Sequence, residues 1–249
     1  MATRLYSIVI DSVDPAALGR WWSDAVGWPV THEEAGEVVV EPSEDNVIVP
    51  ALVFGTVPET KTTKNRVHLD LATTSAEHQA ALIERLVHRG ARTVDIGQGD
   101  ADDDDRVPWS VLADPEGNEL CVLEPRERYL GRGPVAAIVV DAADPAALAR
   151  FWEQASGWRI GFESDVVVSL FGPGDALPDL DFVAVADARS VKNRVHLDVA
   201  PFAGDERDAD VDRLLDLGAR PVDVGQSPDV TWVVLADPEG NEFCVLSPR

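Results

Sequence analysis

The chain has 249 residues, with 45 Asp and Glu against 21 Lys and Arg, and its formal net charge is −24. This balance excludes nucleic acid as a partner, because binding nucleic acid requires a basic surface. No stretch reaches the roughly 20 apolar residues of a membrane span, and no signal-peptide pattern opens the sequence. We therefore expect a cytoplasmic protein with neither a membrane nor a nucleic acid partner.

The N-terminal quarter of the chain predicts a strand, a helix and three further strands. Apolar and β-branched residues predict the first strand over residues 4–10. Asp14 followed by Pro15 is a strong helix start, apolar residues then recur at helical spacing, and Gly27 ends the helix. Further strands are expected over residues 28–31, 37–40 and 47–54.

Residues 67–123 repeat this order of elements. We expect a strand over residues 67–71, a helix over 75–89 that ends at Gly90, and strands over 92–96, 109–113 and 119–123. Asp114-Pro115-Glu116-Gly117-Asn118 has the residues of a tight turn between the last two strands. The first half of the chain is therefore two consecutive β-α-β-β-β modules.

The second half of the chain duplicates the first. Residues 64–72 return as residues 192–200 with one change, Leu71 to Val199, and this identity indicates an internal repeat. The duplication predicts one domain over residues 1–126, a second over 134–249, and a linker over 127–133. The first repeat is longer at an acidic loop, residues 100–105, which we interpret as a solvated connection because it lacks the Gly and Glu spacing of a calcium loop.

The two cysteines of the chain, Cys121 and Cys244, occupy matching places in the two repeats. Each follows an apolar residue in a predicted strand, and apolar surroundings raise the pKa of a thiol. We therefore expect two separate, buried and unreactive thiols rather than a disulfide.

Together, these modules and motifs resemble the vicinal oxygen chelate superfamily of glyoxalases, bleomycin-resistance proteins and extradiol dioxygenases. The resemblance is carried by Asp-Pro-x-x-Leu at the first helix, His-Leu-Asp in residues 68–70, and Asp-Pro-Glu-Gly-Asn-Glu from residue 114, each present in both repeats. It implies an α+β fold of two tandem glyoxalase-like domains, each with paired βαβββ modules that form a cup-shaped eight-stranded sheet. It also implies that the domains dock as an internal pseudo-dimer, in a chain that is a monomer or a homodimer.

The resemblance also implies where metal ligands would lie. Members of the superfamily take them from the first strand of the first module, the first strand of the second module, and the last strand. In the two repeats these positions hold Ser7 and Ala137, His68 and His196, and Cys121 and Cys244, respectively. Since only the histidines match, the standard metal triad is absent from both domains.

Residues on alternate positions of these strands extend the candidate site, because side chains two residues apart share a face of a strand. The candidate ligand-binding residues are His68, Asp70, Trp109, Glu119, His196, Asp198, Trp232 and Glu242. Among them, the candidate ligands of a zinc, nickel, manganese or iron ion are His68, Glu119, His196 and Glu242. In the alternative interpretation, the histidines are hydrogen-bonded residues that hold their strands, and the glutamates bond to the preceding turn.

The Lys-Asn-Arg sequence before each of these histidines has two interpretations. It forms either a cationic rim that steers an anionic substrate, or a set of charges paired with the acidic surface. Trp109 and Trp232, at matching strand positions, are candidates for stacking on a flat ligand.

Two functions follow from these residues. The first is binding of a small organic molecule, aromatic or cationic, in the manner of bleomycin-resistance proteins and without the standard metal triad. The second is a metal-dependent lyase, isomerase or dioxygenase that uses a nonstandard site of His, Glu and Cys. No motif identifies a catalytic residue, so whether the chain is an enzyme stays open.

Overall fold

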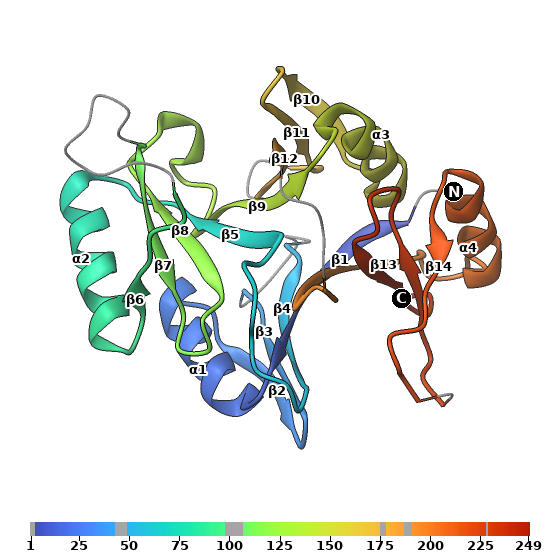
Figure 1. The fold of residues 1–249 in the computed structure, drawn as a ribbon, viewed down its shortest axis with the longest axis horizontal. Helices are drawn as coiled ribbons and strands as arrows, with labels where there is room; N and C mark the ends of the chain where they lie inside the picture. Colours follow the sequence, from blue (N-terminus) through green and yellow to red (C-terminus); the bar gives the residue numbers. More distant parts are fainter. Residues whose placement is uncertain (1–2, 43–48, 98–106, 175–177, 187–190, 228) are drawn as a thin grey trace.

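The computed structural model describes residues 3–42, 49–97, 107–174, 178–186, 191–227 and 229–249. Within these residues the chain forms four α-helices and two eight-stranded sheets (Figure 1). The predicted α+β fold of two tandem glyoxalase-like domains is confirmed. The acidic loop, residues 100–105, lies outside the described residues, as does the start of the predicted strand 47–54.

The helices and strands follow one another in the order that the sequence predicts. Those of the first repeat are β1 (Arg4–Ser12), α1 (Pro15–Val26), β2 (Val30–Glu34), β3 (Glu37–Val40), β4 (Ala51–Thr56), β5 (Val67–Leu71), α2 (Ala76–His88), β6 (Arg92–Thr93), β7 (Trp109–Ala113) and β8 (Glu119–Leu123). A 3₁₀ turn, η1 (Glu127–Tyr129), lies in the linker. The second repeat contains β9 (Val135–Ala142), α3 (Pro145–Ser156), β10 (Arg159–Glu163), β11 (Val167–Phe171), β12 (Asp179–Ala184), β13 (Val195–Ala200), α4 (Arg207–Asp216), β14 (Arg220–Pro221), β15 (Val233–Ala236) and β16 (Glu242–Val245).

Helix α1 begins and ends at the residues that its sequence marks. The Asp14 carboxylate accepts a hydrogen bond from the Ala17 backbone N–H, Pro15 fills the first helical position, and Gly27 takes a left-handed conformation with φ of 72°. These contacts satisfy backbone groups that a helix leaves free at its ends. Helix α3 begins in the same way, with Asp144 accepting from Ala147.

The turn between β7 and β8 attaches this part of the sheet to α1. One carboxylate oxygen of Asp114 accepts the backbone N–H groups of Glu116 and Asn118, each at 2.9 Å. The other accepts the Trp22 indole N–H at 3.1 Å and the side-chain amide of Asn118 at 2.9 Å. The Asp-Pro-Glu-Gly-Asn motif is therefore a structural clamp, and Asp237 makes the same bond to the indole of Trp152.

Glu116 of this turn extends the clamp to the other repeat. Its carboxylate accepts hydrogen bonds from the Ser12 hydroxyl at 2.7 Å and from the backbone N–H groups of Val13 and Asp14, which precede α1. It also pairs with the Arg194 guanidinium at 3.0 Å. A negative group beside a helix N-terminus interacts favourably with the helix dipole.

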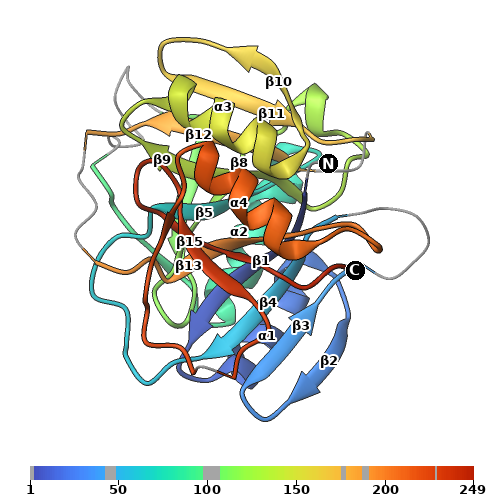
Figure 2. The same ribbon diagram turned by 90° about the vertical axis from the view of Figure 1, so that its right-hand side faces the viewer.

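The modules pair across the two repeats. Sheet A has the strand order β14-β15-β16-β13-β1-β4-β3-β2, and sheet B has the order β10-β11-β12-β9-β5-β8-β7-β6. Figure 2 shows β13 beside β1, followed by β4, β3 and β2. Each sheet thus combines the first module of one repeat with the second module of the other. This detail differs from our sequence interpretation, in which each sheet belonged to one repeat.

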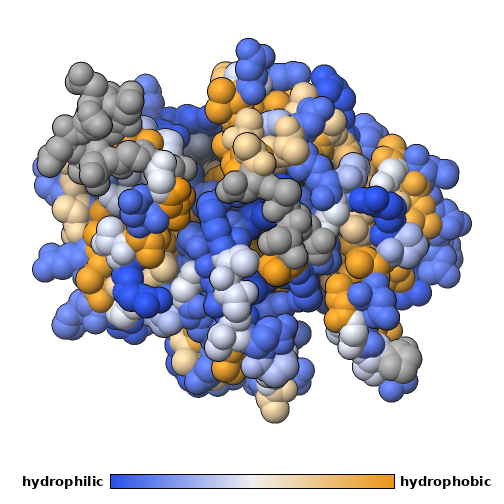
Figure 3. Space-filling view, viewed as in Figure 1, coloured by the Kyte–Doolittle hydropathy of each residue, from blue (hydrophilic) through white to orange (hydrophobic). Residues whose placement is uncertain are grey.

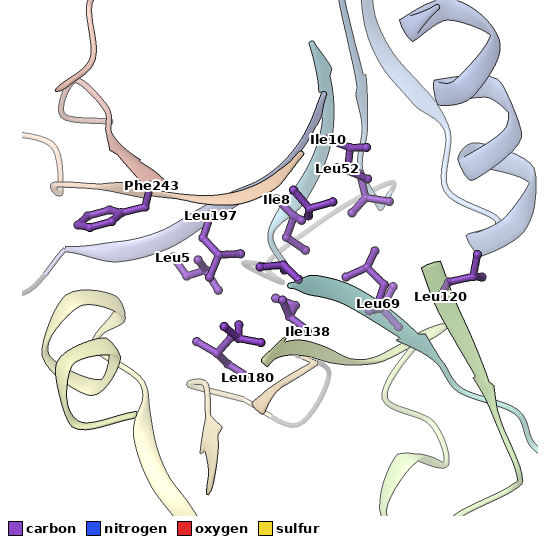
Figure 4. Close-up of a cluster of buried hydrophobic side chains, with 14 of the residues drawn as sticks. Leu5, Ile8, Ile10, Leu52, Leu69, Leu120, Ile138, Leu180, Leu197 and Phe243 are labelled. Atoms are coloured by element: carbon purple, nitrogen blue, oxygen red, sulfur yellow. The ribbon is translucent and has the colours of Figure 1, made fainter. Parts of the chain in front are cut away.

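A common apolar core lies between the sheets and the helices. Leu5, Ile8 and Leu197 of sheet A and Leu69 and Ile138 of sheet B belong to one buried cluster, and Figure 4 shows them between the two sheets. The linker contributes to a second, smaller cluster through Tyr129, which packs near Cys121. The repeats are therefore joined by shared packing as well as by hydrogen bonds.

The surface agrees with the composition. Hydrophilic residues dominate the face seen in Figure 3, with apolar residues scattered among them. Among the described residues, no helix combines the length and apolarity needed to cross a membrane.

Candidate functional site

Side chains alternate in the same way along β5 and β13, and this alternation gives each sheet two different faces. Val67, Leu69 and Leu71 of β5 belong to the common core, whereas His68 and Asp70 point to the opposite side of the strand. We call this opposite side the His face of sheet B, and its equivalent, with His196, the His face of sheet A. The sequence places these side chains because alternation along a strand requires it.

On the His face of sheet B, three side chains come together. His68 Nε2 lies 3.5 Å from Asp70 Oδ1. Asp70 is directly beside Cys121 in the parallel pairing of β5 with β8. One donor atom from each of the three residues lies within 4.8 Å of the others.

The His face of sheet A carries the equivalent cluster. His196 Nε2 lies 3.6 Å from Asp198 Oδ1 and 3.7 Å from Cys244 Sγ. The Ser7 hydroxyl donates a hydrogen bond of 3.0 Å to Asp198 Oδ2. Asp198 is only 7% exposed, and its Oδ1 makes no hydrogen bond to the described residues.

Burial disfavours the charged form of each group in the sheet A cluster. It lowers the pKa of His196 to about 3, with Lys192 adding to the effect. Burial also raises the pKa of Asp198 to about 7, against the opposing hydrogen bond from Ser7. The pKa of Cys244 is raised by burial and by the nearby Asp198. A neutral imidazole and a protonated thiol therefore face the half-ionised carboxyl.

Cys121 resembles Cys244 in this respect, because burial and the adjacent Asp70 raise its pKa. Both cysteines are buried and free of disulfides, as the sequence predicts. A thiol with a raised pKa is a poor nucleophile at neutral pH.

The pairing of modules across repeats changes which first-strand residue accompanies each histidine. Ser7 of the first repeat lies beside Asp198 of the second, and Ala137 lies beside Asp70. Our sequence interpretation grouped Ser7 with His68 and is corrected here. The reason is that β1 pairs with β13 and not with β5. In either grouping neither first-strand residue has a metal-binding side chain, so the standard triad does not fit this chain.

The two candidate glutamates take part in bonds at the strand ends. Glu119 pairs with Lys61 at 2.6 Å and accepts the Asn65 backbone N–H at 3.0 Å. Glu242 accepts the equivalent N–H of Asn193 at 3.2 Å. The described cluster of possible metal donors beside each histidine consists of His, Asp and Cys, and the glutamates are outside it.

The Lys-Asn-Arg sequences hold the two repeats together. Lys64 pairs with Asp141 and Lys192 with Asp11, in each case across the repeats. Arg66 pairs with Glu239 at 3.2 Å, just as Arg194 pairs with Glu116. The two Lys-Asn-Arg segments, with Asp11 and Asp141, line a pocket of about 430 Å³ at the junction. The pairing of their charges favours the second interpretation of the motif.

The two candidate tryptophans differ in exposure. Trp109 is half-buried and packs against the cluster that contains Cys121 and Leu123. Trp232 directly precedes β15 and is 39% exposed. Trp109 is two residues from Val111, which pairs with Cys121, so strand alternation puts Trp109 on the His face of sheet B. Trp232 lies outside β15, so alternation does not place its side chain.

Sequence reasoning missed three polar residues on the His face of sheet B. Asp179 and Asp181 of β12 flank Ala137 and Val139 of β9, and Ser169 of β11 is paired with Asp181. At the matching positions, sheet A has Ala51, Val53 and Val39. A comparison of the repeats at alternate positions in these strands would have found them.

Comparison with known proteins identifies the family. A family model described as the glyoxalase-like domain matches residues 7–123 and again residues 137–246. The chain belongs to the glyoxalase-like domain family. The resemblance to the vicinal oxygen chelate superfamily is thereby confirmed. A comparison with curated proteins gives no significant match.

Solved structures share the fold of this glyoxalase-like protein. Glyoxalase I from Zea mays has a TM-score of 0.68 at 13% identity, with 99% of this chain and 92% of that chain covered. A putative dioxygenase from Bacillus subtilis subsp. subtilis str. 168 has a TM-score of 0.63 at 11% identity, with 99% and 86% covered. At these identities the similarity concerns the fold alone.

Proposed function

We propose that this glyoxalase-like protein binds a small organic molecule at the His faces of its sheets, without the standard metal triad. The observation that carries the proposal is the identity of the side chains at the expected ligand positions. Ser7 and Ala137 replace the first-strand ligands, and buried thiols of raised pKa occupy the last-strand positions.

The surroundings of each cluster suit an organic ligand. The pockets that bind small molecules combine apolar and aromatic walls with a few polar groups that orient the ligand. The His face of sheet B offers Trp109, and each His face offers apolar side chains and the polar groups of one histidine and one aspartate.

Ligand-observed ¹⁹F NMR with a set of fluorinated aromatic fragments tests this function. We expect binding that EDTA does not change and that Trp109→Ala or Trp232→Ala weakens by about tenfold, because each removes a stacking surface. Leu217→Ala, an exposed residue at the end of α4, is the matched control and leaves binding unchanged. Binding insensitive to both tryptophan variants would place the ligand elsewhere.

A second candidate function is metal-dependent lyase, isomerase or dioxygenase chemistry. It is favoured by the buried Asp70 Oδ1 and Asp198 Oδ1, which lack hydrogen bonds although each belongs to a His-Asp-Cys cluster. Imidazole, carboxylate and thiolate donors suit zinc, with Asp taking the part that the sequence interpretation gave to Glu. A bound divalent ion would supply Lewis acidity, which polarises an oxygen of the substrate.

Elemental analysis of protein purified without chelator separates the two functions. The binding function predicts less than stoichiometric metal and the same content in wild type and in the His68→Ala, His196→Ala double variant. Stoichiometric zinc, nickel, manganese or iron that disappears in the double variant would instead establish the metal-dependent alternative.

A further inference from the structure

The two His faces share one cluster but differ in what surrounds it. Each has the His-Asp-Cys arrangement, and the neighbouring first-strand residue differs, with Ser7 in sheet A and Ala137 in sheet B. Because Ala137 has no hydroxyl, Asp70 lacks the hydrogen bond that Asp198 receives from Ser7. In addition to His68 and Cys121, the neighbours of Asp70, further polar side chains reach the same face from the other side of β9.

On that side, β12 brings two further carboxylates to sheet B. Asp179 is fully buried and pairs with Arg128 and with Arg132 of the linker, the latter at 3.1 Å. Its charge is therefore already compensated within the protein. Asp181 differs, because its Oδ1 is buried without a hydrogen-bond partner among the described residues.

The negative charge of Asp70 affects the ionisation of Asp181, which lies on the other side of β9. Burial raises the pKa of Asp181 to about 6, against the opposing hydrogen bond from Ser169, and the charges of Asp179 and Asp70 raise it further. Asp181 flanks Val139 on the side opposite to His68, so two strand spacings, about 10 Å in all, separate the backbones of β12 and β5. Asp70 Oδ1 and Asp181 Oδ1, both buried without a hydrogen bond to the described residues, thus belong to the same His face on either side of β9.

A buried carboxylate oxygen without a donor is costly, and a charged donor compensates it best. Asp70 Oδ1 has His68 Nε2 at 3.5 Å, whereas the side chains of Ala137 and Val139, which lie beside Asp179 and Asp181 in the sheet, offer no cation. The nearby arginines, Arg128 and Arg132, are paired with Asp179. A positively charged hydrogen-bond donor from outside the protein would supply the partner that Asp181 Oδ1 lacks among the described residues.

We propose that the two His faces bind different ligands, and that the face of sheet B takes a compound with a cationic nitrogen, which Asp70 and Asp181 hold. Sheet A has Val53 in place of Asp181 and does not select for that charge. This inference rests on the proposed function and names the ligand class for one of its two sites. The net charge of −24 raises the local concentration of such a cation.

Three matched probes test the inference by ¹⁹F NMR titration: 4-fluorobenzylammonium, 4-fluorobenzyl alcohol and 4-fluorobenzoate. We expect wild-type protein to bind the ammonium at least about tenfold more tightly than the other two probes. Asp181→Asn removes the charge at nearly constant volume and should weaken ammonium binding by about tenfold. Asp212→Asn, which changes an exposed aspartate of α4, is the control and leaves all three affinities unchanged.

A second, reciprocal variant tests the inference without relying on the Asp181 substitution alone. Val53→Asp gives sheet A the acid that it lacks, and we expect it to restore ammonium preference in the Asp181→Asn background. Equal affinity for ammonium and alcohol, or ammonium binding unchanged by Asp181→Asn, would overturn this inference and leave the proposed function standing. If none of the probes binds the wild-type protein, the proposed function itself fails.

Discussion

At the scale of single residues, the motif that both repeats share and the neighbours that differ between them have separate roles. His68, Asp70 and Cys121 recur in the second repeat as His196, Asp198 and Cys244, and in both sets the donor atoms lie within 4.8 Å of one another. Asp181 has no acidic counterpart, since Val53 occupies its place in sheet A. The residues shared by the two repeats form the common part of each His face, and the residues that differ between the repeats determine the charge of that face.

The ionisation of Asp181 should affect stability in a pH-dependent way. Because burial raises its pKa from 3.8 to about 6, the folded protein holds this proton more tightly than the unfolded chain. Stability from this group is fully present below about pH 4 and is lost as the pH rises through 6.

Asp181→Asn cannot ionise and should avoid this loss. Its free energy of unfolding, relative to wild type, should rise by about 1 kcal/mol between pH 5 and pH 7.5, as measured by urea denaturation. Asp212→Asn provides the control for the change in net charge. A difference between Asp181→Asn and wild type that does not vary with pH would show that Asp181 ionises normally.

At the scale of elements, the turn after β7 does more than reverse the chain. Asp114 of this turn accepts a hydrogen bond from the Trp22 indole, and Glu116 accepts one from the backbone N–H of Asp14 before α1. Glu116 also pairs with Arg194, which directly precedes β13 of the other repeat. The sequence predicted a tight turn from its Asp, Pro and Gly. It did not predict the contacts of Glu116, because these join residues about 100 positions apart, as the Ser12 to Glu116 bond shows.

Removal of the Glu116 carboxylate should therefore destabilise the fold. We expect Glu116→Ala to lower the free energy of unfolding by about 2 kcal/mol, since two backbone N–H groups and a buried guanidinium lose their acceptor. Glu239→Ala should have a similar effect, because Glu239 makes the equivalent bonds to Ala143, Asp144 and Arg66.

An exposed ion pair provides the control for this measurement. Glu33 pairs with Arg20 on the surface, and Glu33→Ala should cost less than about 0.5 kcal/mol. Urea denaturation of the three variants gives the comparison. Equal effects for Glu116→Ala and Glu33→Ala would contradict the role assigned to the turn.

At the scale of the whole molecule, the repeats are intertwined by strand pairing. Sheet A needs β1 of the first repeat and β13 of the second, and sheet B needs β5 and β9. The linker, with Tyr129 buried and Arg132 paired to Asp179, also packs on sheet B. The two repeats should therefore stay associated without a covalent connection.

Cleavage of the linker tests this expectation in the full chain. A protease site inserted after Leu130, which is exposed, should allow the chain to be cut into halves that co-elute on size exclusion. The same halves should separate in urea, and the uncut insertion protein is the control. Halves that separate as folded monomers under native conditions would show that each repeat forms its own sheet.

The sequence by itself determined the modules, their duplication and the family. Helix caps, tight turns and strand alternation act over a few residues, so Asp14, Gly27 and the β5 pattern were sufficient to predict elements and faces. The same local rules brought His68 and Asp70 to one face of a strand.

Only the tertiary structure decided which modules pair, and hence which residues share a site. Asp11 and Asp141 are equivalent in the two repeats, as are Lys64 and Lys192, so the sequence allows the same ion pairs within a repeat or across repeats. The structure places them across. It also puts Asp181 on the same sheet face as His68, because β12 and β5 are joined through β9 of the shared sheet. Such contacts depend on strand order, which is a property of the assembled sheets and not of any local stretch of sequence.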